Sequence, residues 1–149
     1  MIADTATRVQ KHTAQHVNSR IQREIQERVS EFESSQDAES ITRKLKELDR
    51  EWDTERALQT NFAIFSMLGL VLANTVSKRW LALALGVPAF MIQHSLQGWC
   101  PPLPVMRRIG LRTSREINEE RFALKALRGD FREAARSDSA EEILRAVKA

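Results

Sequence analysis

The sequence predicts an all-α protein built around a two-span transmembrane helical hairpin that is flanked by amphipathic cytoplasmic helices. Between Ala57 and Met106 only Lys78 and Arg79 are formally charged, although Asp, Glu, Lys and Arg make up 29% of the chain. Outside this stretch, apolar residues recur at steps of three and four, which is the helical period. Alternating runs rich in Val, Ile and Thr are absent from the sequence, so few signals favour strands.

Residues 1–59 are predicted to form an amphipathic helical arm with two apolar stripes. Asp37 follows a polar break and offers an N-cap to the second helix. Nothing breaks the pattern after Glu39, so this helix is expected to continue into the first apolar run. A lone amphipathic helix is marginal in water, so the stripes need covering by each other, by a second copy or by a partner protein. The first stripe is Val17, Ile21, Ile25 and Phe32, and the second is Ile41, Leu45, Leu48 and Trp52.

Residues 60–100 are predicted to form the hairpin, with spans at about 61–77 and 80–98 and a turn at Ser77–Trp80. These lengths lie at the lower edge of the roughly 17–25 residues that a span needs. The strictly apolar cores are shorter and are also compatible with a buried helix of a soluble bundle. We expect membrane insertion and keep the soluble bundle as an alternative.

Small residues recur at helical spacing in both spans, and such faces let helices approach closely in lipid. We therefore predict that one small face packs against the other across the turn. The first face is Ser66, Gly69 and Ala73, and the second is Ala82, Gly86 and Ala89.

Interface residues bracket the second span. Trp80 and Trp99 stand at its two ends, where indoles prefer the headgroup level, and Arg107 and Arg108 follow it. Lys and Arg are more frequent beside the outer ends of the spans than in the turn. Both termini are therefore expected to be cytoplasmic, with the interface anchored by these four residues.

Residues 101–149 are predicted to form a basic helical C-terminal arm. The prolines after Cys100 end the second span. Thr113 and Glu116 form a capping box for a helix that should stop at Gly129. A second box, Ser139 with Glu142, predicts a short helix ending near Val147.

Cys100 is the candidate thiol of this chain. As the single cysteine, it excludes an intramolecular disulfide. At a membrane interface it could serve as a thiolate, a sulfur carrier, a palmitoylation site or a haem ligand. No base, resolving cysteine or metal ligand stands beside it in the sequence, so we favour a small apolar residue that fills the interface.

Three polar residues, Gln93, His94 and Gln97, fall within the second span. Polar groups inside a span are functional candidates by default. Near the helix end, however, they can simply meet headgroups or the partner helix, which is the interpretation we favour. His12 and His16 share a helical face but lack a third ligand, so we predict no metal site. Motifs for an enzyme site or a cofactor are absent, and the net charge of +3 is too small and mixed to indicate nucleic acid.

Two short segments carry a resemblance to a known family. The run from Gly98 to Pro101, followed by Arg107–Leu111, is similar to the YgaP-like family of small two-span membrane domains of bacteria, which also occurs fused behind a rhodanese in inner-membrane rhodaneses. The resemblance covers about residues 60–130. It implies a hairpin of the bacterial inner membrane that is often dimeric and has no established activity. Rhodanese catalysis does not carry over, and only the cysteine at the membrane edge maps, onto Cys100.

The sequence therefore predicts a non-enzymatic integral membrane scaffold or accessory subunit without a cofactor. Its expected partners are the lipid bilayer, further copies of itself and proteins of a larger membrane complex, which would bind the two stripes. One alternative is a thiol or sulfur relay through Cys100 that serves a partner oxidoreductase or sulfurtransferase. The other is the soluble helical bundle.

Overall fold

The computed structural model describes residues 6–35, 37–134, 139–141 and 143–144. Within these ranges the ordered elements are helices and no strand occurs, so the predicted all-α class is confirmed. The elements are α1 (Arg8–Lys11), α2 (Gln15–Ser35), α3 (Ala38–Leu48), α4 (Thr54–Thr75), the 3₁₀ turn η1 (Lys78–Trp80), α5 (Leu81–Gln97), α6 (Leu103–Arg108), α7 (Ser114–Arg128) and α8 (Phe131–Ala134).

The chain forms two compact units that are interleaved along the sequence. The first comprises residues 1–21 and 52–115, and the second comprises residues 22–51 and 116–149. The three consecutive segments expected from the sequence do not coincide with these units. The reason is tertiary packing: Val9 of α1 joins the core of the hairpin's base, whereas Ile41 of α3 shares a core with α7.

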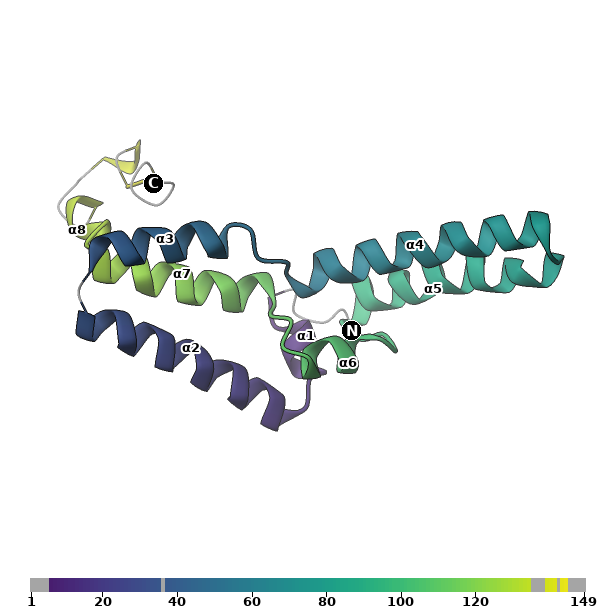
Figure 1. The fold of residues 1–149 in the computed structure, drawn as a ribbon, viewed down its shortest axis with the longest axis horizontal. Coiled ribbons are helices and arrows are strands. Elements are labelled where there is room, and N and C mark those ends of the chain that lie inside the picture. Colours follow the sequence, from purple (N-terminus) through teal and green to yellow (C-terminus); the bar gives the residue numbers. More distant parts are fainter. Residues whose placement is uncertain (1–5, 36, 135–138, 142, 145–149) are drawn as a thin grey trace. The chain divides into compact units, whose positions relative to one another are not determined.

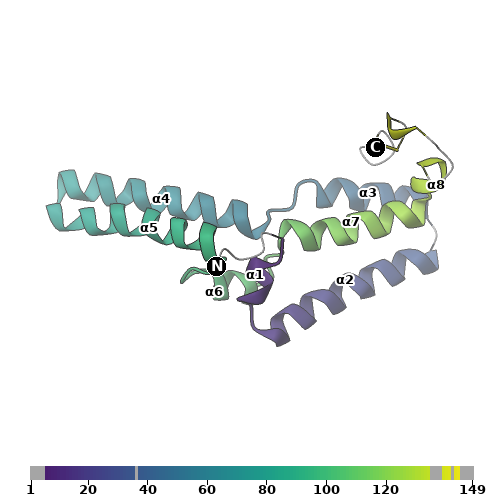
Figure 2. The same cartoon turned by 180° about the vertical axis from the view of Figure 1, so that it is seen from behind.

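The hairpin of the first unit consists of α4 and α5, which run antiparallel and side by side in both views (Figures 1 and 2). The expected continuous helix from Glu39 into the first apolar run is wrong, because α3 ends at Leu48 and α4 begins at Thr54. The Asp53 side chain caps α4 by accepting a hydrogen bond from the Arg56 N–H at 2.7 Å. The Thr54 N–H and hydroxyl both donate to the Arg112 carbonyl, at 2.8 and 2.9 Å.

The two ends of α5 are set by local chemistry. At its start, Ser77 caps the η1 turn that carries Lys78 and Arg79 at the tip of the hairpin. At its end, Gly98 adopts φ = 79°, a left-handed conformation that glycine accepts without strain. A Cβ added there would lie 2.6 Å from the Arg8 Cβ, so this glycine also lets α1 approach the helix end. Pro88 lies inside α5 without interrupting it.

Close approach of α4 and α5 depends on Gly69. A Cβ added at this position would lie 2.7 Å from the Ala84 backbone nitrogen, so only glycine fits the present spacing. Gly69, Ala73 and Ala84 are buried, and Ser66 is half-buried. The small face predicted for the second helix is wrong. Its packing face includes Ala84, whereas Ala82 and Ala89 are exposed and a Cβ at Gly86 would meet nothing.

Large apolar side chains lie on the outside of the hairpin, while glycine and alanine lie between its helices. Helix α4 is long and apolar enough to cross a membrane, and only 28% of its most apolar stretch is buried. Among the described residues, it is the one helix that is both long enough and apolar enough by this measure of length and composition. Helix α5 has 17 residues, or about 26 Å of helix, which is at the lower limit for a span. Apolar residues of the hairpin that are at least half exposed include Ile64, Met67, Leu70, Val71, Leu85 and Ile92.

The second unit has a conventional buried core between α3 and α7, which run side by side (Figure 1). Its residues are Ile41, Leu45, Leu48, Ile117 and Leu124, with Phe32 packed against them. Ile25 of α2 is also buried, and Val17 and Ile21 are buried in the first unit. Most residues of the two stripes are therefore covered within the chain, and their role in binding partners stays a prediction. Trp52 is the exception: it is 48% exposed and stacks against the Arg56 guanidinium, 4.5 Å from the ring centre.

Charged contacts lie along the same unit. Arg28 of α2 makes two parallel hydrogen bonds to the Glu120 carboxylate, at 3.0 and 3.1 Å, and Glu120 is fully buried. Arg121 donates to Asp49 at 2.9 Å. A buried carboxylate is costly unless it is paired, so this pairing allows Glu120 to face the interior.

The end of α7 agrees with the predicted stop. The helix ends at Arg128, and Gly129 has φ = 90°. The second predicted capping box includes Glu142 and its helix was expected to end near Val147. Both residues lie outside the described ranges.

We predict that Asp130 stabilises the second unit at neutral pH. Its carboxylate accepts from the Arg128 Nε at 2.8 Å, and this hydrogen bond lowers the pKa of Asp130. A carboxyl with a lowered folded-state pKa stabilises the fold above its unfolded pKa, about 3.9, and loses that contribution as the pH falls through the folded value. Thermal unfolding should therefore show Asp130→Asn melting below the wild type at pH 7, with the difference shrinking once the pH falls below about 4 and disappearing only below the lowered folded-state pKa. A difference that is constant with pH would contradict this ion pair.

Candidate functional site

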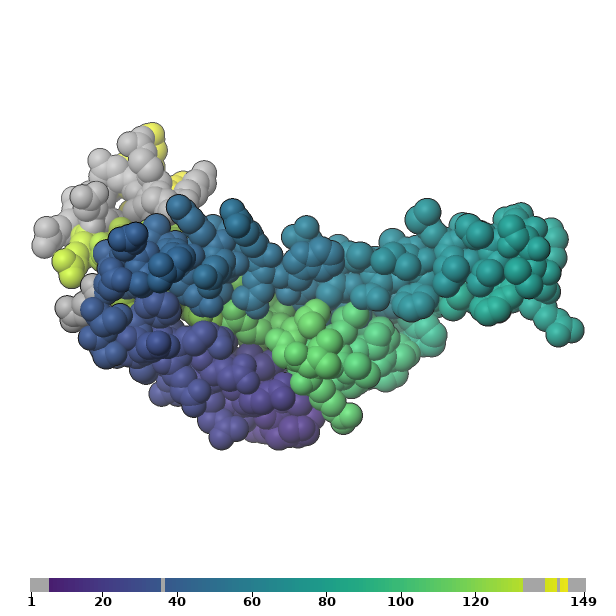
Figure 3. Space-filling view, in the orientation of Figure 1, coloured from purple at the N-terminus to yellow at the C-terminus, as the bar shows by residue number. Residues whose placement is uncertain are grey.

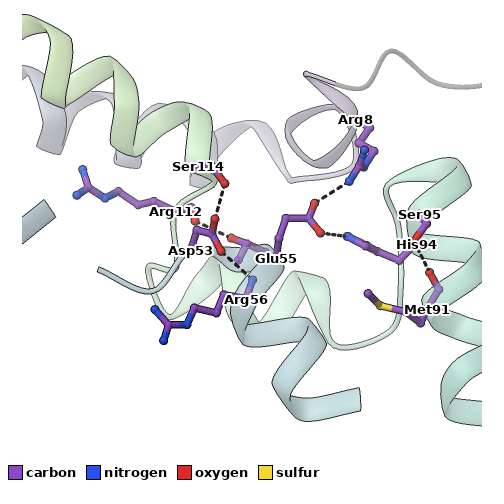
Figure 4. Close-up of polar contacts among 10 residues, drawn as sticks. Arg8, Asp53, Glu55, Arg56, Met91, His94, Ser95, Arg112 and Ser114 are labelled. Carbon is purple, nitrogen blue, oxygen red and sulfur yellow. Dashed lines mark hydrogen bonds and ion pairs between the residues drawn. The ribbon is translucent and has the colours of Figure 1, made fainter. Parts of the chain in front are cut away.

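A cluster of polar side chains lies at the open end of the hairpin, opposite its tip. Figure 4 shows Glu55, in the first turn of α4, between Arg8 of α1 and His94 of α5. Its carboxylate accepts from Arg8 Nη2 at 3.0 Å through one oxygen and contacts His94 Nε2 at 3.1 Å through the other. Because a carboxylate only accepts hydrogen bonds, Nε2 of His94 carries a proton in this arrangement. The carboxylate thus fixes the orientation of the ring and holds the proton of Nε2.

Cys100 is a second neighbour of this ring. Its side chain and that of His94 are fully buried, and the thiol is close enough to the imidazole to interact with it. Cys100 also belongs to the apolar core at the hairpin's base, together with Val9, Leu58, Phe62 and Leu103. The thiol thus lies among apolar groups and interacts with an imidazole that is held by a carboxylate.

Glu55 is the site residue that the sequence analysis missed. It lies 39 positions before His94, and no local motif links the two. The pairing of residues between α4 and α5, once known, would have indicated Glu55. Gly69 packs against Ala84, and moving fourteen residues outward along each helix leads from these to Glu55 and Gly98. Gly98 is about one helical turn beyond His94, so an antiparallel pair in this register brings Glu55 to the end of α5. The interpretation of His94 as meeting the partner helix therefore agrees with its position.

Arg107, which the sequence predicts as an interface anchor, makes its contacts inside the protein. Its side chain is fully buried and holds the corner between α1 and α2 against α6. Nε donates to the Thr13 hydroxyl at 3.2 Å, Nη2 to the Asn18 side-chain oxygen at 3.0 Å and Nη1 to the Leu111 carbonyl at 2.9 Å. A planar guanidinium can meet several acceptors at once, which explains why it can be buried here.

The remaining predicted residues are not brought together. Arg108 is exposed, and Trp80 and Trp99 are 41% and 36% exposed near the two ends of α5. Gln93 is half-buried, whereas Gln97, His12 and His16 are exposed. Among the described residues, no group of three or more His, Cys, Asp or Glu side chains is placed to hold a metal ion.

Comparisons with known proteins found no match to this chain. No protein-family model matches the chain, and no curated protein or solved structure is detectably similar to it. The resemblance to the YgaP-like family therefore stays a prediction from the sequence, and function is inferred from the geometry alone.

Proposed function

We propose that this protein is a two-span integral membrane protein that acts as a scaffold or accessory subunit of a membrane complex. The hairpin of α4 and α5 crosses the bacterial inner membrane, and both termini lie in the cytoplasm. The helical second unit is then a cytoplasmic part that the hairpin anchors at the membrane.

The observation that carries this proposal is the inverted arrangement of side chains in the hairpin. Helices associating in lipid gain little from burying large apolar groups, and they pack through small residues instead. The Gly69–Ala84 contact, with Leu70 and Leu85 exposed outside it, follows that rule. The space-filling view shows the side chains of α4 spread over one face of the hairpin (Figure 3). Soluble monomers rarely expose an apolar surface of this kind.

The second unit supports its assignment to the cytoplasm because its packing is the opposite of that in the hairpin: its large apolar side chains lie inside. Ile41, Leu45 and Leu48 are buried there, and charged side chains are paired at the surface. This is the pattern of a unit that folds in water. The hairpin thus packs through small residues, whereas the second unit packs through large apolar residues. The change from one kind of packing to the other coincides with the charge gap in the sequence.

An accessory subunit also needs a surface for other helices. On α5, Ala82, Gly86 and Ala89 form a small-residue face that α4 leaves uncovered. In lipid such a face suits a neighbouring helix, from a second copy or another subunit. The contact surface proposed for partners is therefore this face.

The test compares Leu70→Arg with Val105→Arg in native membranes treated with alkaline carbonate. Leu70 and Val105 are similarly exposed, at 50% and 59%, but Leu70 lies on the hairpin and Val105 on α6. An arginine at the centre of a span costs about 2.5–3.5 kcal/mol. We expect the wild type and Val105→Arg to stay in the membrane pellet, and Leu70→Arg to be lost from it.

Two outcomes would overturn this function. Release of the wild type by carbonate, with Leu70→Arg as stable as Val105→Arg, would identify the hairpin as part of a soluble bundle. Crosslinking of the same membranes that traps only monomers would refute the role of scaffold or subunit while leaving membrane insertion intact.

A further inference from the structure

The two structural units differ in charge. Residues 1–21 and 52–115, which include the hairpin, contain ten Lys and Arg side chains but only three Asp and Glu side chains. Residues 22–51 and 116–149 contain 13 Lys and Arg side chains and 17 Asp and Glu side chains. The positive charge therefore belongs to the unit that holds the hairpin. Apart from Lys78 and Arg79 at the tip, its cations belong to the segments that flank the open end.

We propose that the open end of the hairpin binds the anionic headgroups of phospholipids in the membrane that the hairpin crosses. This inference rests on the proposed function and adds the class of lipid that the protein selects. The binding side chains are Lys11 beside α1, Arg56 of α4 and Arg108 of α6, all of which are exposed. Two indoles, Trp52 and Trp99, accompany them and are also exposed.

The acidic side chains of this unit are already engaged within the protein. Among its described residues they are Asp53 and Glu55. Asp53 caps α4, and the Glu55 carboxylate is held between a guanidinium and an imidazole. Lys11 and Arg108 make no ion pair with a described residue. Their charges are therefore open to anions from outside the chain.

Helix α6 covers the depth at which acyl chains give way to headgroups. Its first residue, Leu103, belongs to the same apolar cluster as Phe62 of α4. By Arg112 the chain is level with the start of α4, because the Arg112 carbonyl accepts from the Thr54 N–H at 2.8 Å. Eight helical residues, from Phe62 back to Thr54, span about 12 Å, and the headgroup region on one side of a bilayer is about 5–7 Å thick. The exposed Val105 thus lies nearer the acyl chains than the arginine that ends α6.

The cations come from different elements, and this favours lipid over a protein partner. Lys11 follows Val9, which packs at the base of the hairpin, whereas Arg56 is in the first turn of α4 and Arg108 ends α6. Lipids surround an inserted hairpin on every side, so cations on separate elements can each meet a headgroup. An anionic leaflet attracts basic side chains beside a span, whereas a zwitterionic one lacks that charge.

The test reconstitutes the full chain with Trp80→Phe into vesicles, so that the two remaining indoles, Trp52 and Trp99, both flank the open end. Quenching by phosphatidylglycerol with brominated acyl chains is compared with quenching by equally brominated phosphatidylcholine, which gives the relative affinity for the anionic lipid. Each Lys or Arg near an anionic surface strengthens the attraction about fivefold. We expect a preference for phosphatidylglycerol that falls about fivefold or more in Lys11→Gln/Arg108→Gln.

The matched control is Lys78→Gln/Arg79→Gln, which removes one lysine and one arginine from the tip instead. It should leave the preference of the open end unchanged. Equal quenching by the two lipids before either replacement, or an equal loss of preference in both double variants, would overturn this inference and leave membrane insertion intact. If neither brominated lipid quenches the indoles, the hairpin does not lie in the bilayer and the proposed function itself fails.

Discussion

Replacing Arg107 with methionine should destabilise the first unit by about 3 kcal/mol or more. Methionine fills a similar volume but donates no hydrogen bond. The Thr13 hydroxyl, the Asn18 amide oxygen and the Leu111 carbonyl would each lose a charged donor at 2.9–3.2 Å. Hydrogen bonds to charged groups contribute about 1.5–3 kcal/mol each, and loss of several from a buried site exceeds the cost of an ordinary substitution.

The matched control is Arg108→Met, one position along the same helix. Arg108 is exposed, so the same change of side chain should alter stability by no more than about 0.5 kcal/mol. The measurement is denaturant unfolding of the full chain in mild detergent, followed by circular dichroism. Equal stability of the two variants would show that the guanidinium of Arg107 does not hold the α1–α2 corner.

Gly69→Ala should weaken the hairpin, whereas Gly86→Ala should not. The added Cβ at Gly69 would lie 2.7 Å from the Ala84 backbone nitrogen, and backbone atoms cannot rotate away as a side chain can. The helices must separate, and overpacking of this kind costs about 1–3 kcal/mol. At Gly86 the Cβ meets nothing within 4 Å, and alanine favours the helix over glycine by up to about 1 kcal/mol.

The two substitutions are chemically identical, so opposite signs can only come from packing. Titration with a denaturing detergent, followed by the loss of helicity, would give the two stabilities relative to the wild type. A destabilised Gly86→Ala beside a neutral Gly69→Ala would mean that the small face predicted from the sequence, and not the observed one, packs in the hairpin.

The apolar pattern explains how much of the fold could be predicted. The charge gap between Ala57 and Met106 located the hairpin, and the turn at Lys78 and Arg79 followed from the only charges within it. The stop at Gly129 was also predictable, because a left-handed residue at a helix end favours glycine. These features depend on neighbouring residues, and local chemistry decides them.

The break between α3 and α4 was not predictable in the same way. Asp53 is a good N-cap, but a charged residue after an amphipathic seam is equally compatible with a continuous helix. What distinguishes the two is the Arg112 carbonyl, which receives both the N–H and the hydroxyl of Thr54. That acceptor lies 58 residues away in the chain. A helix boundary that depends on a hydrogen bond to a group far along the chain cannot be predicted from the residues around it.

The candidate site shows the same contrast. Cys100 and His94 could be selected from the sequence, since one is the only thiol and the other a polar residue in an apolar run. Their association with Glu55 could not, because it depends on the register set by Gly69 against Ala84. The residues around Cys100 in the sequence therefore could not show that Glu55 lies beside the same imidazole.

The sequence by itself determined that this protein is helical, where its apolar hairpin lies and which residue carries its thiol. Only the tertiary structure decided which faces pack, that the stripes of α2 and α3 are covered by the chain itself, and that Arg107 is buried. The physical reason is the range of the interactions. Helical period and capping act over a few residues, whereas burial and the pairing of charges depend on groups that the fold brings together from opposite ends of the chain.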